Sequence, residues 1–446
     1  MNEKMNDALN EISDKHIDQA AKAKKHKATR WLAPVAAVLA AVILVTTFLN
    51  PISAKAVALA DYSQGDRRGH SDAAHDYIDV LSDFFSTSIS QVLSGSSGNN
   101  QAYSPINLYL GLAAVAELSG GDEQILSALN AKDLEALRQM STTLWNVSYH
   151  DDGDQTLLTN SLWLDNDLTY SQTVMDHLAK HHYTSVYQGD FGTKRTNRDI
   201  ANWLNKQTGN LLKDSADNIN LSADTVFALY STIYYQAKWA NDFSAAQNTP
   251  GVFHAESGDL TCTYMNQKKN QGYYYWGADF GAVTKGLKDG SRMWLILPDE
   301  DKTIDDVLAA GEYAKMLFGP WSEEQQKYMF INLSLPKFDI RAGGDLKEDL
   351  QAMGITDVFD PGKADFSAAM PDFQEDVWLS SVNQATRVAI DEKGVTAASY
   401  IEFPFFGAGA AMPPTDTIDF VLDRPFLFVV TNYLGIPLFA GVVNEP

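Results

Sequence analysis

Residues Asp391–Pro414 read DEKGVTAASYIEFPFFGAGAAMPP. After Gly394 the stretch alternates as a strand does, and every second residue is small or apolar: Val395, Ala397, Ser399, Ile401, Phe403 and Phe405. From Gly407 onward it has nothing to bury, and it ends in two prolines. The same stretch therefore predicts both a sheet strand and an exposed tether.

The rest of the chain predicts helices first and strands later. Apolar residues recur every three or four positions over 75–93, which indicates an amphipathic helix. Ser104 and Pro105 are typical of the cap and first turn of a second helix, which is apolar enough to be buried. Five later segments read as strands: 225–239, 293–298, 328–340, 378–390 and 420–430. This order favours an α+β fold with largely antiparallel sheets.

The charge and the cysteine content exclude several kinds of partner. Asp and Glu number 57 against 34 Lys and Arg, a formal net charge of −23. Because a polyanionic backbone needs the opposite field, we expect no nucleic-acid binding. Cys262 is the only cysteine, so the chain can form neither an intrachain disulfide nor a cysteine-based metal site. We expect Cys262 to be a buried small hydrophobe.

No motif for catalysis or cofactor binding is present. His177 and His181 lie four residues apart, as zinc ligands on one helix face do, but no HExxH glutamate lies between them. We interpret them as solvated surface histidines and expect no metal. Residues 407–412 (GAGAAM) lack the third glycine of a dinucleotide turn, and two prolines follow where a helix should begin. With neither a GxSxG elbow nor a P-loop, we expect no catalytic residues, no enzyme activity and no cofactor.

The N-terminal part predicts a membrane segment. Trp31–Leu49 is apolar apart from two threonines and would span ~28 Å as a helix, enough for one crossing. Lysines and Arg30 lie close to its start, so residues 1–30 are predicted to be a cytoplasmic tail, with everything after Asn50 outside. We favour an anchor because leader and core are long for a signal peptide. A secretory signal cleaved near Ala56 or Ala60 is the alternative.

Two further regions follow this segment. Residues 50–70 lack an amphipathic period and are predicted to form a stalk or linker. Beyond them the composition is evenly globular, without repeats, low-complexity tracts or long linkers. Residues 71–446 are therefore predicted to form a single domain.

Several stretches of this domain resemble the serpins, the serine protease inhibitor family. The most specific are AIDEKGVTAAS at 389–399, which resembles the family's hinge, and LDRPFLFVVTNYLGIPLFAGVVNEP at 422–446, which resembles its closing signature. Supporting matches occur in the expected order at 103–130, 231–239, 297–300 and 335–368. The resemblance implies a serpin fold, with several helices around three β-sheets and an exposed reactive-centre loop.

The resemblance also implies site residues. The hinge corresponds to Glu392, Gly394, Val395, Thr396, Ala397, Ala398 and Ser399. The distance from the hinge glycine puts the scissile bond at Ala408–Gly409, with Ala410–Ala411 as the alternative because the loop is a few residues longer than usual. A buried polar cluster beneath the central sheet, the shutter, corresponds to Ser104, Asn107, Ser231 and Gln384. Trp239 corresponds to the breach, where the loop enters the sheet. Ser231 and Gln384 replace the asparagine and histidine of many family members.

The implied function is irreversible inhibition of serine proteases. A protease cleaves the loop, and the part before the cut inserts as a strand into the large sheet before the acyl-enzyme is hydrolysed. Alanine at the cleaved bond favours an elastase-like or subtilisin-like target. We expect a monomer that binds one protease covalently and is either held at the cell surface through residues 31–49 or secreted. A non-inhibitory serpin-fold binding protein on the cell surface is the alternative.

Overall fold

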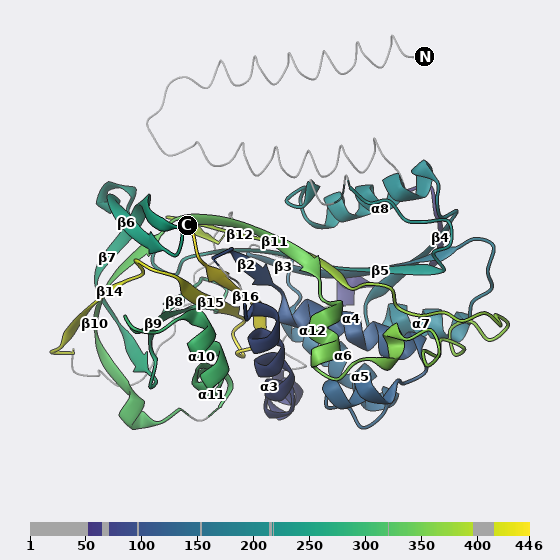
Figure 1. Cartoon of the computed structure of the whole chain (residues 1–446), viewed down its shortest axis with the longest axis horizontal. Coiled ribbons are helices and arrows are strands. Elements are labelled where there is room, and N and C mark those ends of the chain that lie inside the picture. The colour runs from purple at the N-terminus through teal and green to yellow at the C-terminus, as the bar shows by residue number, and fades with distance from the viewer. Residues whose placement is uncertain are drawn as a thin grey trace, which may run out of the picture. The chain divides into compact units, whose positions relative to one another are not determined.

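The computed structural model describes residues 52–64, 71–95, 98–151, 154–213, 216, 218–319, 321–395 and 414–446 (Figure 1). The predicted anchor 31–49, the hinge residues 396–399 and both candidate scissile bonds lie outside the described residues. From Pro51 to Pro446 the chain forms one compact unit. Within the described part, no helix is long and apolar enough to span a membrane.

Seven strands form the first sheet, in the order β1-β4-β3-β5-β13-β12-β11. Neighbouring strands are antiparallel except for β3 and β4, which are parallel. The strands are β1 (Lys55–Ala58), β3 (Gln155–Asp165), β4 (Thr184–Gly189), β5 (Phe227–Lys238), β11 (Phe338–Asp345), β12 (Asn383–Asp391) and β13 (Gly394–Val395). Strand β13, at the centre, is only two residues long.

A second array of nine strands is joined through one long strand, β7 (Gly258–Trp276). Strand β7 pairs with β6 and β10 along most of its length, and with β8 only through its last residues, Tyr274–Trp276. Where the resemblance implies three β-sheets, the described strands therefore form two arrays, because β7 belongs to both parts of the second one. The other strands are β2 (Gln101–Tyr103), β6 (Thr249–Ala255), β8 (Phe280–Gly286), β9 (Arg292–Pro298), β10 (Gln326–Pro336), β14 (Thr417–Val421), β15 (Phe426–Thr431) and β16 (Pro437–Val443).

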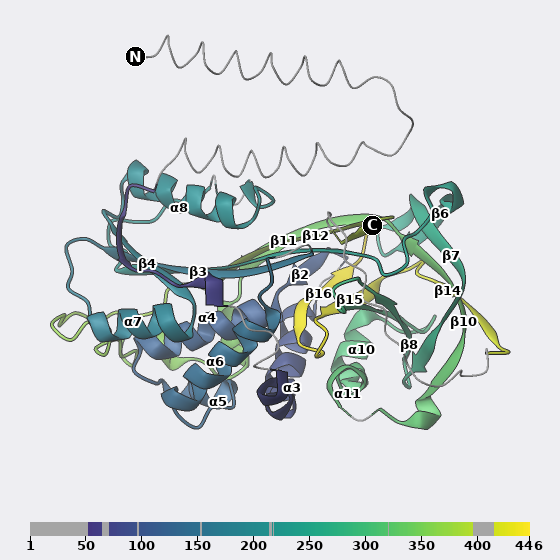
Figure 2. The ribbon, with the colours of Figure 1, turned by 180° about the vertical axis from the view of Figure 1, so that it is seen from behind.

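Helices cover the seven-stranded sheet on both faces. Figures 1 and 2 show α8 on one face, and α3 to α7 with α12 on the other. Every residue of α4 except Gly111 is buried, as expected for a helix that is apolar all round. The helices are α3 (Ser71–Leu93), α4 (Pro105–Leu118), α5 (Glu123–Ala128), α6 (Leu134–Ser148), α7 (Gln172–His181), α8 (Lys194–Gln207), α10 (Ile304–Ala310), α11 (Glu312–Phe318) and α12 (Lys347–Ala352).

The predicted strand runs are confirmed over most of their length, but two of them are each divided into two strands. The run 328–340 becomes β10 and β11, with Pro336 and Lys337 at the junction. The run 420–430 becomes β14 and β15, separated by 422–425, which includes Pro425. Proline lacks the N–H that a ladder needs, so it favours an interruption of the strand at these points. The first interruption is also a change of sheet, because β11 belongs to the seven-stranded sheet and β10, like β14 and β15, to the nine-stranded array.

The first described residues, Ile52–Gln64, form an N-terminal strap along the edge of the sheet. Strand β1 pairs antiparallel with β4, with Ala56 opposite Tyr187. Ahead of β1, the buried Asp199 carboxylate of α8 accepts hydrogen bonds from Ser53 N at 3.0 Å, Ser53 Oγ at 2.5 Å and Ala54 N at 3.1 Å. Ile52 and Ala54 also pack against an apolar cluster made of Trp163, Phe191, Ile200 and Trp203.

The other end of the strap is held by aromatic packing. The Tyr62 ring lies 6.0 Å from that of Trp145 and 6.1 Å from that of Tyr149, and its hydroxyl donates to Tyr183 O at 3.3 Å. The prediction of a stalk over residues 50–70 is therefore wrong for Ile52–Gln64. Four strand residues are too few to reveal a period, and the partners of the strap lie far away in the sequence.

Candidate functional site

The hinge begins inside the seven-stranded sheet. Val395 is 3% exposed and lies opposite Ala237 of β5 on one side and Ile390 of β12 on the other. A Cβ atom at Gly394 would come within 2.2 Å of Ala237 O, so this close approach of backbones requires glycine. The predicted hinge residues Gly394 and Val395 thus form β13, the start of a strand between β5 and β12.

Beyond β13, strands β5 and β12 have no backbone pairing with each other in the described part of the chain. A small cavity lies between them, lined by Ile233 from β5, by 385–387 from β12 and by Phe439 from β16. Residues that follow α8 close it from the other face. Among the described residues, the two strands therefore border a gap in the ladder beyond β13, and we call it the insertion gap.

The four shutter residues lie together at the floor of this gap, where α4 begins. Gln384 of β12 accepts from Ser104 N at 3.0 Å and donates to Ser104 O at 3.3 Å. Ser231 of β5 donates to Asn107 O at 3.4 Å, and Asn107 N donates to Ser104 Oγ at 3.3 Å. The side chains thus bond mainly to backbone atoms instead of to one another. One helix N-terminus holds both strands that border the insertion gap.

Trp239 lies at the other end of the gap and holds the backbone of the hinge. Its Nε1 donates to Asp391 O at 2.8 Å, and its backbone N–H donates to Lys393 O at 3.0 Å. Phe243 N donates to Glu392 O at 3.0 Å. Residues Trp239–Phe243, which we call the platform, therefore bond to three consecutive hinge carbonyls.

The Glu392 side chain is fixed by groups that the sequence reasoning missed. Lys337 Nζ lies 2.6 Å from Glu392 Oε1, and Asn248 Nδ2 donates to the same oxygen at 2.5 Å. The hydrogen bond from Lys337 is the largest cause that lowers the pKa of Glu392, to about 2. Lys337 directly precedes β11, 55 positions from its partner, and no local pattern links the two residues.

The histidines have surroundings that differ from the prediction. His177 Nδ1 lies 3.0 Å from Glu117 Oε1, and the fully buried His182 Nε2 lies 3.4 Å from Oε2 of the same carboxylate. Arg138 donates to both oxygens, at 2.7 and 2.8 Å. The interpretation of His177 as a solvated surface residue is therefore wrong. Among the described residues, no His, Cys, Asp and Glu side chains gather in a group that could hold a metal, and Cys262 is half-buried on β7.

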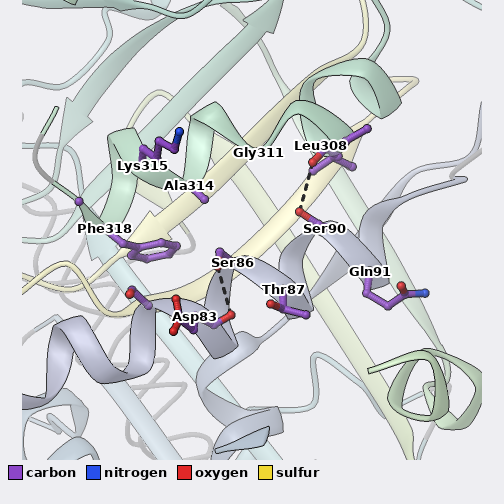
Figure 3. Close-up of a pocket in the computed structure, with 13 residues that line it drawn as sticks. Asp83, Ser86, Thr87, Ser90, Gln91, Leu308, Gly311, Ala314, Lys315 and Phe318 are labelled. Atoms are coloured by element: carbon purple, nitrogen blue, oxygen red, sulfur yellow. Dashed lines mark hydrogen bonds between the residues drawn. The ribbon is translucent and has the colours of Figure 1, made fainter. Parts of the chain in front are cut away.

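A separate pocket of about 610 Å³ lies between α3 and the pair α10 and α11 (Figure 3). Ser90 Oγ bridges its two walls, with a hydrogen bond to Leu308 O at 3.3 Å. On the α3 wall, Ser86 Oγ donates to Asp83 O at 3.1 Å. None of these residues was expected to belong to a site. The pocket is remote from the hinge in the chain, and its lining includes none of the hinge, shutter or platform residues.

The comparisons with known proteins decide the family. The family model for serpins, described as serine protease inhibitors, matches residues 81–446. The chain belongs to the serpin family. Members of this family are described as serine protease inhibitors.

Individual serpins match this chain along nearly the whole of their own length. Plasminogen activator inhibitor 1 of Sus scrofa is 28% identical, over 82% of this serpin and 92% of that protein. The native state of Tengpin, a thermophilic serpin, superimposes with a TM-score of 0.71 at 23% identity, over 83% and 94% of the two chains. Thyroxine-binding globulin in complex with thyroxine has a TM-score of 0.67 at 19% identity, over 82% and 99%. The two structural likenesses support the fold.

Proposed function

We propose that this serpin is an irreversible suicide inhibitor of serine endopeptidases. The observation that carries the proposal is the insertion gap: β13 lies between β5 and β12 over two residues, and beyond it these two strands do not pair with each other in the described part of the chain. A strand that continued from Val395 would find a ladder on both sides. The alternation of small and apolar residues from Val395 to Phe405 matches a strand with one face on the core.

In the proposed mechanism, the serine of the protease attacks the carbonyl of the scissile bond. The peptide bond breaks, the new amino terminus leaves, and the carbonyl carbon stays bound to the serine as an ester. The freed strand then inserts before water can hydrolyse the ester. A dozen new ladder hydrogen bonds contribute ~0.5–1.5 kcal/mol net apiece. Burial of Ile401, Phe403 and Phe405 adds to this, while Pro404 removes one donor.

The residues of the loop limit which proteases it can trap. We assign the scissile bond to Ala408–Gly409, with Ala410–Ala411 as the alternative, so alanine enters the primary pocket in either case. A small apolar pocket of the elastase type accepts alanine, whereas the Asp-lined pocket of trypsin requires a basic residue. No basic residue lies between Lys393 and Arg424.

The expected result is a covalent 1:1 complex with elastase or subtilisin that survives SDS, and none with trypsin. Mass spectrometry of the peptide released from the complex should show a first residue of Gly409 or Ala411. A peptide that begins at Gly407, together with a preference for chymotrypsin, would overturn the assigned bond. Cleavage in the loop without any covalent complex would favour the alternative, a non-inhibitory binding protein. The thyroxine complex of a protein with this fold supports keeping that alternative.

The proposed location is the cell surface, with Trp31–Leu49 as a single membrane anchor and the serpin domain, as a monomer, outside. The apolar length of this segment and the basic residues before it support the proposal. Membrane fractionation followed by protease treatment of intact cells should release the domain from the membrane fraction. Recovery of only a soluble extracellular protein that starts near Val57 or Asp61 would show that the segment is a cleaved signal.

A further inference from the structure

Lys285 of β8 is a buried cation directly beneath the platform. The residue is 2% exposed, although lysine is rarely buried without a partner. Its Nζ donates to Asn241 O in the platform and to Gln267 Oε1 on β7, both at 2.6 Å. The same atom lies 4.6 Å from the centre of the Phe243 ring and 5.8 Å from that of Trp239. Three residues of the platform therefore surround one ammonium group.

The partners of Lys285 are neutral. Among the described residues, no carboxylate lies within ion-pair distance of its Nζ. The acidic groups of the platform and the hinge are Asp242 and Glu392, and the basic groups on the surrounding elements include Lys393, Lys238, Lys268, Lys269 and Arg292. Asp242 lies 3.6 Å from Lys393, and Glu392 is bound to Lys337, so both carboxylates have other cationic partners. Two hydrogen bonds and two aromatic faces thus replace the hydration of a full charge.

The lowered pKa of Lys285 indicates that its neutral partners replace the lost hydration only in part. Burial lowers the pKa of Lys285 from 10.5 to about 8, against a smaller opposing effect of Asp242. The unfolded chain therefore binds the proton more tightly than the native protein does. Protonated Lys285 destabilises the native state fully below pH 8, and this destabilisation fades as the pH rises from 8 to 10.5.

The platform connects this cation to the hinge. Trp239 and Phe243, whose rings cover the ammonium, donate backbone hydrogen bonds to Lys393 O and Glu392 O. These hinge residues directly precede the strand that must lengthen during insertion. A movement of the hinge backbone during insertion would therefore also move the rings that cover Lys285.

We infer that Lys285 is a positioning residue that makes the uninserted state less stable and so favours insertion of the cleaved loop. The inference rests on the proposed function. Loss of the charge at this position should stabilise the uninserted protein and slow insertion. More inhibitor molecules would then be hydrolysed as ordinary substrate for each protease that is trapped.

The test compares the wild type, Lys285→Met and Lys268→Met, a matched control at an exposed lysine on the neighbouring β7. At pH 7.5 we expect Lys285→Met to melt several degrees above the wild type. At pH 9.5 this difference in melting temperature should be smaller. The number of serpin molecules consumed per trapped subtilisin or elastase should at least double. Lys268→Met should behave as the wild type in both assays. Lys285→Gln, which keeps a neutral donor, serves if the methionine variant does not fold.

Three outcomes would overturn the inference. They are a melting temperature for Lys285→Met below that of the wild type at pH 7.5, a difference in melting temperature that does not change with pH, and an unchanged number of inhibitor molecules consumed per trapped protease. Absence of covalent complexes from every variant, the wild type included, would instead count against the proposed function. In that case the melting temperatures still decide whether the buried charge destabilises the native state.

Discussion

Val395→Arg is expected to convert the inhibitor into a substrate. Val395 is buried between Ala237 and Ile390, so an arginine there must either bury an unpaired charge or keep the hinge out of the sheet. An unpaired buried charge costs several kcal/mol. About 3 kcal/mol corresponds to a change of roughly a hundredfold in the partition between insertion and hydrolysis. The measurement is the ratio of covalent complex to cleaved serpin after reaction with excess protease.

Val421→Arg is the matched control. Val421 lies on β14, beyond the loop, and is 38% exposed, so the same substitution adds an exposed charge without entering the insertion gap. It should form as much complex as the wild type. Complex formation by Val395→Arg at the wild-type level would contradict insertion of the cleaved loop as the inhibitory step.

Glu392→Lys is expected to destabilise the uninserted state. The substitution removes a carboxylate that Lys337 and Asn248 hold, and it places two ammonium groups together. Loss of a partly buried, charge-assisted interaction costs about 1–3 kcal/mol. A fall in melting temperature of several degrees should follow, with faster loss of inhibitory capacity on storage. Thermal melts and residual complex formation over time measure the two effects.

The double variant Glu392→Lys with Lys337→Glu restores the opposite charges and should recover part of the loss. Asp339→Lys, which breaks a more exposed pair with Arg387 on β11 and β12, should change the melting temperature less. The sign of the pH effect follows from the lowered pKa of Glu392. Its contribution to stability is present above the unfolded pKa near 4.5 and is lost as the pH falls toward 2. If the double variant is no more stable than Glu392→Lys, the pair is not what stabilises the hinge.

The sequence predicted those features of the site that depend on local periodicity and backbone chemistry. The alternation after Gly394 and the glycine itself identify a strand and its starting point, because both signals lie within a few residues. In the same way, Ser104 and Pro105 predicted the start of α4, and in the structure Ser104 caps this helix. The family resemblance, and no local pattern, identified Ser231, Gln384 and Trp239. The structure places these three residues along the insertion gap.

The features that could not be predicted depend on contacts between distant segments. Nothing in the sequence around Lys337 distinguishes it from an exposed lysine, and only the turn from β10 into β11 brings it to Glu392. Lys285 lies in a strand whose pattern does not mark it as a buried charge, since its acceptors come from β7 and the platform. The strap was missed because its strand is four residues long and its register is set entirely by β4.

The strap has a consequence for self-association. A sheet built to admit a further strand is exposed to strands from other molecules at every unpaired edge. Without β1, the edge of β4 would present unpaired N–H and C=O groups along the side of the sheet that lies farthest from the insertion gap. Lys55–Ala58 occupies that edge with a strand from the same chain. The outermost strand of the sheet is thus β1, which is only four residues long and begins with the exposed Lys55. A short edge strand that carries a lysine limits edge-to-edge pairing with another molecule.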